Sequence, residues 1–84
     1  AEYSIGKITA DTPLYYFDQG RPMETSVHVA KGTWVRVLSQ HRNHDGAIWL
    51  EVQTPDADGK FSNQSDSGLL HESRIEERTT VSRR

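Results

Sequence analysis

The stretches that decide the fold are KGTWVRVL (Lys31–Leu38), AIWLEVQ (Ala47–Gln53) and SGLLHESRI (Ser67–Ile75). Each is rich in β-branched, aromatic or leucine side chains and has a turn-forming residue at its edge, a combination typical of a β-strand. The second stretch alternates most cleanly. One face of that strand carries Ile48, Leu50 and Val52, and the other carries Trp49, Glu51 and Gln53.

Shorter β-patterns flank these stretches. Strands are expected over residues 3–9, 14–17 and 23–29, and Gln40 to Gly46 is expected to form a hairpin turn because Asn43, Asp45 and Gly46 are turn formers. The polar stretch from Thr54 to Ser67 is expected to be a long exposed loop or a weak hairpin, and residues 71–74 a short 3₁₀ turn before Ile75. No segment has sustained helical periodicity. The sequence therefore predicts an all-β barrel or sandwich of five or six short antiparallel strands.

Size and composition narrow the classes of protein. The chain has 84 residues, a mass of 9.5 kDa, a net charge of −2 and no cysteine. This length suits one domain with a small core, whose stability must come from the β-sheet because there is no disulfide or zinc-thiolate site. Without a basic surplus, nucleic-acid binding is not expected. No apolar run approaches the roughly 20 residues needed to span a bilayer, so membrane insertion is not expected either.

The composition changes near the C-terminus. Residues 1–77 are expected to form the barrel, and residues 78–84, which include three arginines, a basic, disordered tail or linker. Because Ala1 stands where an initiator Met would be, we expect a processed or excised piece: a mature chain after signal-peptide removal or a trimmed part of a larger protein. The compartment stays open, with the periplasm or the extracellular space favoured over the cytoplasm.

The quoted stretches give the chain a resemblance to a known family. The Gly-containing turn before WVRVL, the IWLEV strand and the final GLLHESRI look like a Src-homology-3-like barrel, most of all the bacterial type. The aromatic segment Pro13 to Phe17 corresponds in position to the first aromatic segment of the eukaryotic form. The similarity covers about residues 7–77.

The resemblance implies an aromatic surface groove that binds an extended protein or peptide segment, as polyproline II ligands are bound. Tyr15 and Phe17 match the groove aromatics of the first segment, and Trp49 matches the Trp of the groove wall. In the closing turn, His71 replaces the proline and Arg74 the tyrosine of the eukaryotic family. Bacterial relatives are often attached modules that bind cell-wall peptide or another protein, or that serve as spacers.

Aromatic side chains in a small barrel also pack in its core, so the two roles of these residues have to be separated. Strand alternation places Trp49 on the face opposite Leu50 and Val52, and we therefore expect Trp49 on the surface. An exposed Trp49 would indicate a binding patch, whereas a buried one would be a packing residue.

Other groups of residues give only weak indications of metal binding or catalysis. His41 and His44 next to Asp45 offer metal ligands but lack a third fixed one, and a solvated hairpin tip is the simpler interpretation. The long loop carries Asp56, Asp58 and Asp66, whose spacing does not match an EF-hand loop. Near His71 and Glu72, neither Ser67 nor Ser73 has a triad framework. We therefore expect no enzyme activity, no cofactor and no bound metal.

Three hypotheses follow, in this order. The first is a non-catalytic module that binds a protein or peptide and belongs to a larger bacterial protein or assembly, with a site comprising Tyr15, Phe17, Trp49, His71 and Arg74. The second is a structural domain of an envelope or phage complex that docks through sheet edges and the loop at residues 54–67. The third is an enzyme accessory or metal-dependent activity through His41 and His44.

Overall fold

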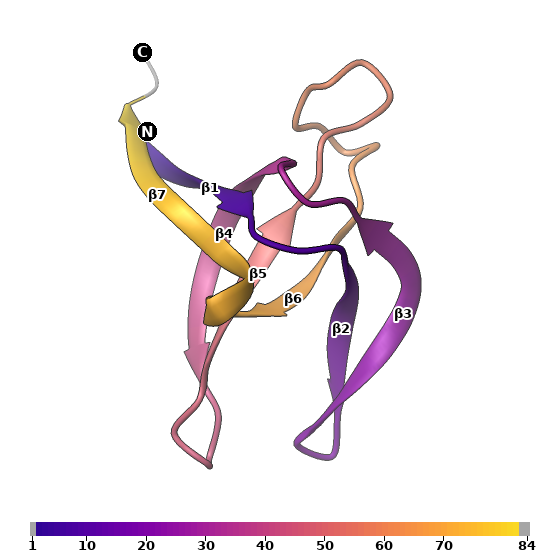
Figure 1. Ribbon diagram of the computed structural model, residues 1–84, viewed down its shortest axis with the longest axis vertical. Coiled ribbons are helices and arrows are strands. Elements are labelled where there is room, and N and C mark those ends of the chain that lie inside the picture. The colour runs from indigo at the N-terminus through magenta and orange to yellow at the C-terminus, as the bar shows by residue number, and fades with distance from the viewer. Residues whose placement is uncertain (1, 83–84) are drawn as a thin grey trace.

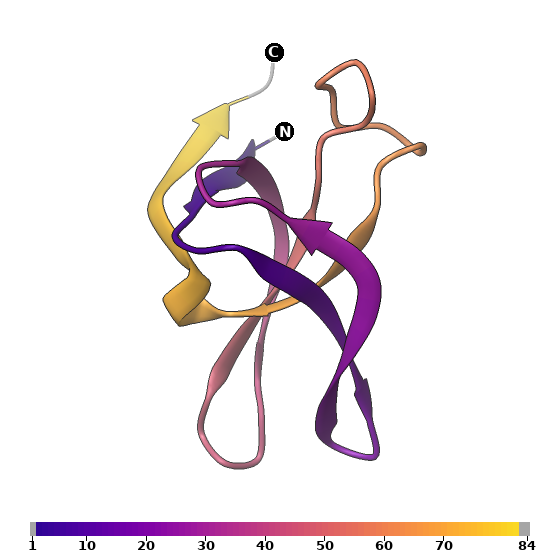
Figure 2. The same cartoon turned by 45° about the vertical axis from the view of Figure 1, so that its right-hand side comes forward.

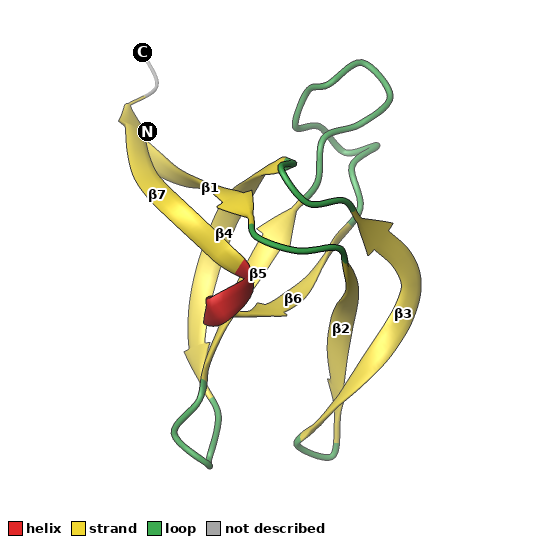
Figure 3. Cartoon of the chain, viewed as in Figure 1, coloured by secondary structure: helices red, strands yellow, loops and turns green. Residues whose placement is uncertain are grey.

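The computed structural model describes residues 2–82, apart from the side chains of residues 2, 77, 78, 81 and 82. Seven strands and one 3₁₀ turn make up the fold (Figures 1 and 3). The strands are β1 (Glu2–Ile8), β2 (Thr12–Asp18), β3 (Arg21–Val29), β4 (Trp34–Arg42), β5 (Ile48–Gln53), β6 (Ser67–His71) and β7 (Ile75–Ser82). The turn, η1 (Glu72–Arg74), lies between β6 and β7. The predicted all-β class and the 3₁₀ turn before the last strand are confirmed.

All seven strands belong to one antiparallel sheet in the order β3-β2-β6-β5-β4-β1-β7. The two end strands, β3 and β7, are not paired with each other within residues 2–82, so the sheet curls without closing into a barrel. The expectation of a closed barrel of five or six strands is therefore wrong in both closure and number, although the antiparallel architecture holds. Among the described residues, no helix is long and apolar enough to cross a bilayer.

The last strand extends further than the sequence pattern indicated. β7 reaches Ser82 and pairs with β1 in a register that includes Ser4↔Thr80 and Ile5↔Thr79. Residues 78–82 of the predicted tail are thus part of β7 in the structure, where they complete the hydrogen bonds of β1. Residues 83 and 84, the remainder of that predicted tail, lie outside the described residues.

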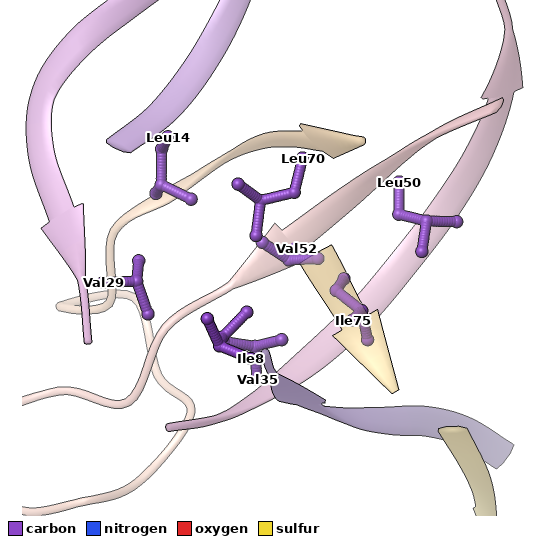
Figure 4. Packing of buried hydrophobic residues seen from close by; sticks show 8 residues of the cluster. All are labelled: Ile8, Leu14, Val29, Val35, Leu50, Val52, Leu70 and Ile75. Atoms are coloured by element: carbon purple, nitrogen blue, oxygen red, sulfur yellow. The ribbon is translucent and has the colours of Figure 1, made fainter. Parts of the chain in front are cut away.

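A single cluster of aliphatic side chains forms the core (Figure 4). It draws one or two residues from each strand, so that the cluster joins all parts of the sheet. Its members are Ile8, Leu14, Val29, Val35, Leu50, Val52, Leu70 and Ile75. The alternation of AIWLEVQ is confirmed on its apolar face, since Leu50 and Val52 are buried in this core.

Gly68 allows β2 to meet β6. A Cβ atom at this position would lie 2.8 Å from Leu14 Cβ and 3.3 Å from the Tyr15 carbonyl oxygen. Only a residue without a side chain fits so close to another backbone. The pairing of the two strands is short, with Tyr15↔Leu69 as its one register pair. Gly68 therefore lets the β2–β3 hairpin pack onto the rest of the sheet.

Two register shifts in the sheet determine where particular side chains lie. The β4–β5 register shifts between Val37 and Ser39, which leaves Leu38 as an extra, exposed residue in a bulge. A second shift occurs in the β2–β3 hairpin, where Thr25 Oγ1 donates to the Leu14 carbonyl oxygen at 2.9 Å and accepts from the Val27 amide at 3.2 Å. The Thr25 hydroxyl thus replaces ladder hydrogen bonds that the bulge interrupts.

The turns of the β2–β3 and β4–β5 hairpins lie at one end of the molecule, and the loop before β6 lies at the other (Figures 1 and 2). At the hairpin end, a Cβ atom on Gly20 would lie 3.2 Å from His44 Cε1, so the two turns approach each other closely. The stems of these two hairpins carry three of the five predicted site residues, Tyr15, Phe17 and Trp49.

Candidate functional site

Three ring-bearing side chains gather around Trp49 on the side of the sheet away from the aliphatic core. The Trp49 ring lies edge-on to Phe17 at 5.0 Å, to Tyr15 at 5.5 Å and to His71 at 5.5 Å, measured between ring centroids. The interplanar angles of 76°, 73° and 89°, in the same order, are those of the favourable edge-to-face arrangement. We call Tyr15, Phe17, Trp49 and His71 the aromatic cluster.

Strand register explains why distant parts of the sequence meet in this cluster. Trp49 is opposite His71 in the β5–β6 pair, and Tyr15 is opposite Leu69 in the β6–β2 pair. Tyr15 and Phe17 are two residues apart on β2 and therefore project from the same face. Three neighbouring strands thus place one or two rings each on a common face.

Trp49 itself is not a surface residue. Its side chain is 8% exposed, so the expectation of an exposed Trp49 is wrong. The predicted face is correct, because Trp49 projects away from the core that holds Leu50 and Val52. The rings of Tyr15, Phe17 and His71 cover it, and these come from segments that strand alternation alone cannot place.

The rings around Trp49 keep part of their surface open. Tyr15, Phe17 and His71 are all half-buried, and Tyr15 also packs against the aliphatic core. The cluster is therefore a second apolar packing unit whose centre is buried and whose rim contacts solvent. Such a rim offers rigid ring surface at a small cost in side-chain entropy, as in many binding sites.

His71 is fixed by the 3₁₀ turn that follows it. The Ser73 amide donates to His71 Nδ1 at 3.2 Å, and the Ser73 hydroxyl lies 2.8 Å from the same nitrogen. This nitrogen accepts the amide hydrogen, so the His71 ring acts as the N-terminal cap of η1. The contact between His71 and Ser73 is thus a local cap, in which His71 Nδ1 already accepts a hydrogen bond.

Arg74, the fifth predicted site residue, lies apart from the rings. It is exposed at the end of η1, and its backbone carbonyl accepts from the Thr9 amide at 2.9 Å. Within the described part of the chain, Arg74 makes no ring contact with the aromatic cluster. The structure therefore brings four of the five predicted residues together and leaves Arg74 three positions along the chain from His71.

A hydrogen-bonded group of polar side chains on β4 and β5 was not predicted from the sequence. Ser39 Oγ donates to Glu51 Oε1 at 2.9 Å and lies 2.9 Å from His41 Nε2. Because the serine hydrogen goes to the carboxylate, the histidine must donate to the serine, which is the reverse of the hydrogen bonding in a nucleophilic triad. Register pairing of Ser39 with Glu51 explains the contact, and the bulge at Leu38 sets that register.

The two hairpin histidines do not form a metal site with neighbouring residues. His41 contacts Ser39, whereas His44 lies against Gly20 of the other hairpin. In the part of the chain that the structure describes, no group of three or more His, Asp or Glu side chains is placed to hold a metal ion.

Asp56 organises the long loop instead of offering oxygen ligands to a cation. Its Oδ1 accepts from the amides of Asp58 and Lys60, both at 2.9 Å, and its Oδ2 accepts from the Ser62 hydroxyl at 2.6 Å. Both carboxylate oxygens are thus engaged within the loop. The hydrogen bond from Ser62, followed by the bond from the Lys60 amide, lowers the pKa of Asp56 below its ordinary value of 3.8.

The lowered pKa predicts a loop that loosens in acid. A carboxyl with a depressed pKa in the folded state stabilises that state above its unfolded pKa and loses the contribution as the pH falls through the folded pKa. We therefore expect the amide signals of Asp58 and Lys60 in NMR spectra to move together below about pH 4. Asp56→Asn should remove this response. In the control Asp58→Asn, which changes an exposed carboxylate of the same turn, the response of the Lys60 amide should persist; its loss there would contradict the assignment to Asp56.

Protein-family models, curated protein sequences and solved structures each gave no match to this chain.

Proposed function

We propose that this domain is a non-catalytic module that binds an extended peptide segment of a partner protein across the aromatic cluster. The observation that supports this best is the arrangement of Tyr15, Phe17 and His71 edge-on around a buried Trp49, outside the aliphatic core. Trp49 is buried and therefore a packing residue, so the surface offered to a ligand is that of the half-buried Tyr15, Phe17 and His71 rings around it.

The packing of the rings favours binding of a preformed extended ligand. Trp49 holds its three neighbours in fixed orientations, so little side-chain entropy remains to be lost when a ligand contacts their exposed surface. A polyproline II segment has a low entropy cost of its own and buries its apolar ridges between aromatic rings. The proposed ligand is thus an extended, proline-containing segment, and a cell-wall peptide is the alternative ligand of the same site.

Polar side chains at the rim and just beyond it would select among such ligands. His71 lies in the cluster at the end of β6, and the exposed guanidinium of Arg74 follows it on η1. A cation at this position favours ligands with an acidic residue beside the apolar segment. The proposed specificity therefore differs from that of a groove that selects basic ligand residues.

Phe17→Ala tests the proposal with a ring at the rim of the cluster. Peptides selected from a display library of extended, proline-containing sequences serve as the probe, and isothermal titration measures their affinity. We expect the variant to bind the selected peptides at least about tenfold more weakly, because one aromatic anchor at an interface is worth about 1 to 2 kcal/mol or more.

Tyr16→Ala is the matched control. Tyr16 is the neighbouring aromatic residue of β2, is 50% exposed and projects from the opposite face of the strand. It should leave peptide affinity unchanged. Equal affinity losses in both variants, or selected peptides whose NMR shift changes map away from the aromatic cluster, would reject the site, and a library that yields no binder would reject the proposed ligand class.

A further inference from the structure

We propose a second, independent binding site, for a carboxylate on a molecule that also carries an aromatic ring, in a hollow between β1, β4 and the loop before β6. The hollow has a volume of about 280 Å³ and is lined by Tyr3, Arg36, Lys60 and Phe61. Two of these side chains are cationic, two are aromatic, and none is acidic. This composition matches a ligand that combines a negative charge with a flat apolar group.

Arg36 supplies the charge that a carboxylate would meet. Its guanidinium carbon lies 4.6 Å from the centroid of the Tyr3 ring, a distance at which a cation–π interaction holds the guanidinium over the ring face. The Nε atom of Arg36 is buried and has no hydrogen-bond partner among the described residues. A buried donor without an acceptor is costly, so a ligand oxygen in the hollow would gain by accepting from it after a small shift of the half-buried Arg36 side chain.

The loop brings the other two lining residues to this position. Gln53 is opposite Arg36 in the β4–β5 register, and its Nε2 donates to the Ser62 carbonyl oxygen at 2.8 Å. Asp56 holds the other side of the same turn through the Lys60 amide and the Ser62 hydroxyl. Hydrogen bonds at the Lys60 amide and at Ser62 thus fix Lys60 and Phe61 beside Arg36. The Lys60 charge also acts on Asp56.

A carboxylate suits this hollow better than a bare inorganic anion. The planar guanidinium offers parallel N–H donors to the two oxygens of a carboxylate. Tyr3 and Phe61 are both half-buried and present apolar surface that a bare anion would leave unused. Two sources of such a group are a free aromatic acid and the C-terminus of a polypeptide that ends in an aromatic residue.

The hollow is separate from the aromatic cluster. Gln53 is opposite the lining residue Arg36 in the β4–β5 register. It is four residues beyond Trp49 on β5, a separation of about 13 Å. Binding at one site can therefore fail while binding at the other persists.

NMR titration with benzoate tests the site. The probe signals are the side-chain Nε–H resonance of Arg36 and the ring resonances of Tyr3 and Phe61. We expect all three to shift along one saturable curve, and Arg36→Gln to weaken the apparent affinity at least about tenfold because the ion pair is lost. Arg42→Gln is the matched control: Arg42 is an exposed arginine of the same strand whose Nη1 lies near the Gly46 carbonyl oxygen at 3.4 Å, and benzoate should bind this variant as it binds the natural sequence.

Further probes separate the ligand classes and the sources. Acetate and phosphate should bind at least about tenfold more weakly than benzoate, and equal binding of all three would overturn the aromatic requirement. A short peptide ending in Phe is compared with the same peptide as its C-terminal amide. If only the free acid binds, with an affinity equal to or above that of benzoate, the source is a polypeptide. If the free-acid peptide binds more weakly than benzoate, the source is a free aromatic acid. Benzoate shifts that do not saturate, or that survive in Arg36→Gln, would overturn the site.

Discussion

Trp49→Ala is expected to lower the free energy of unfolding by about 3 to 5 kcal/mol, the usual loss when a buried aromatic side chain is truncated. The 8% exposed Trp49 ring is edge-on to three other rings, all of which lose a packing partner in the variant. A domain of this size is stable by only about 4 to 13 kcal/mol, so this loss is a large part of the total. Urea unfolding followed by far-UV circular dichroism measures it.

The second tryptophan is the control. Trp34 is 41% exposed, and Trp34→Ala should change the free energy of unfolding by less than about 0.5 to 1 kcal/mol. A loss in Trp49→Ala no larger than that in Trp34→Ala would show that the ring of Trp49 is not packed in solution. Because Trp49→Ala disturbs stability, it cannot serve as a clean test of ligand binding, and Phe17→Ala takes that role.

Leu70→Ala is expected to cost about 2 to 5 kcal/mol because it leaves a cavity at the centre of the aliphatic core. Leu70 is fully buried and lies on β6, opposite Leu50 of β5 in the register. It also follows the short contact between β6 and β2, so its loss should weaken the attachment of the β2–β3 hairpin to the sheet. Thermal unfolding by calorimetry, or urea unfolding as above, gives the change.

Leu38→Ala provides the comparison for this experiment, since it removes the same atoms from a leucine that is 46% exposed. Leu38 is the extra residue of the β4 bulge, and its truncation should cost less than about 1 kcal/mol. Similar losses in the two leucine variants would contradict the assignment of Leu70 to the core.

The sequence predicted the fold best where strand alternation is regular. In AIWLEVQ the side-chain period of two correctly separated Leu50 and Val52 from Trp49. It could not predict the burial of Trp49, because that depends on rings that β2 and β6 bring from distant segments. Period two assigns a side chain to a face, and only tertiary packing decides whether that face is covered.

Two other differences between the predicted and the observed structure are the length of β7 and the hollow at Arg36. Thr79 and Thr80 are β-branched and gave a weak strand signal, but the basic composition of the C-terminus obscured it, and the pairing with β1 decided the outcome. The hollow at Arg36 was not predictable, because it requires the loop hydrogen bonds of Asp56 and Gln53 to bring Lys60 and Phe61 to β1 and β4.

The position of β1 between β4 and β7 determines when this domain can fold during its synthesis. The first strand forms hydrogen bonds along one of its edges only with the last strand, so completion of the sheet requires nearly the whole chain. On the ribosome, β1 keeps an unpaired edge until β7 has left the exit tunnel, and such an edge can pair with other chains. Folding is thus delayed to the end of translation of the domain, and a premature stop before β7 would produce an aggregation-prone fragment.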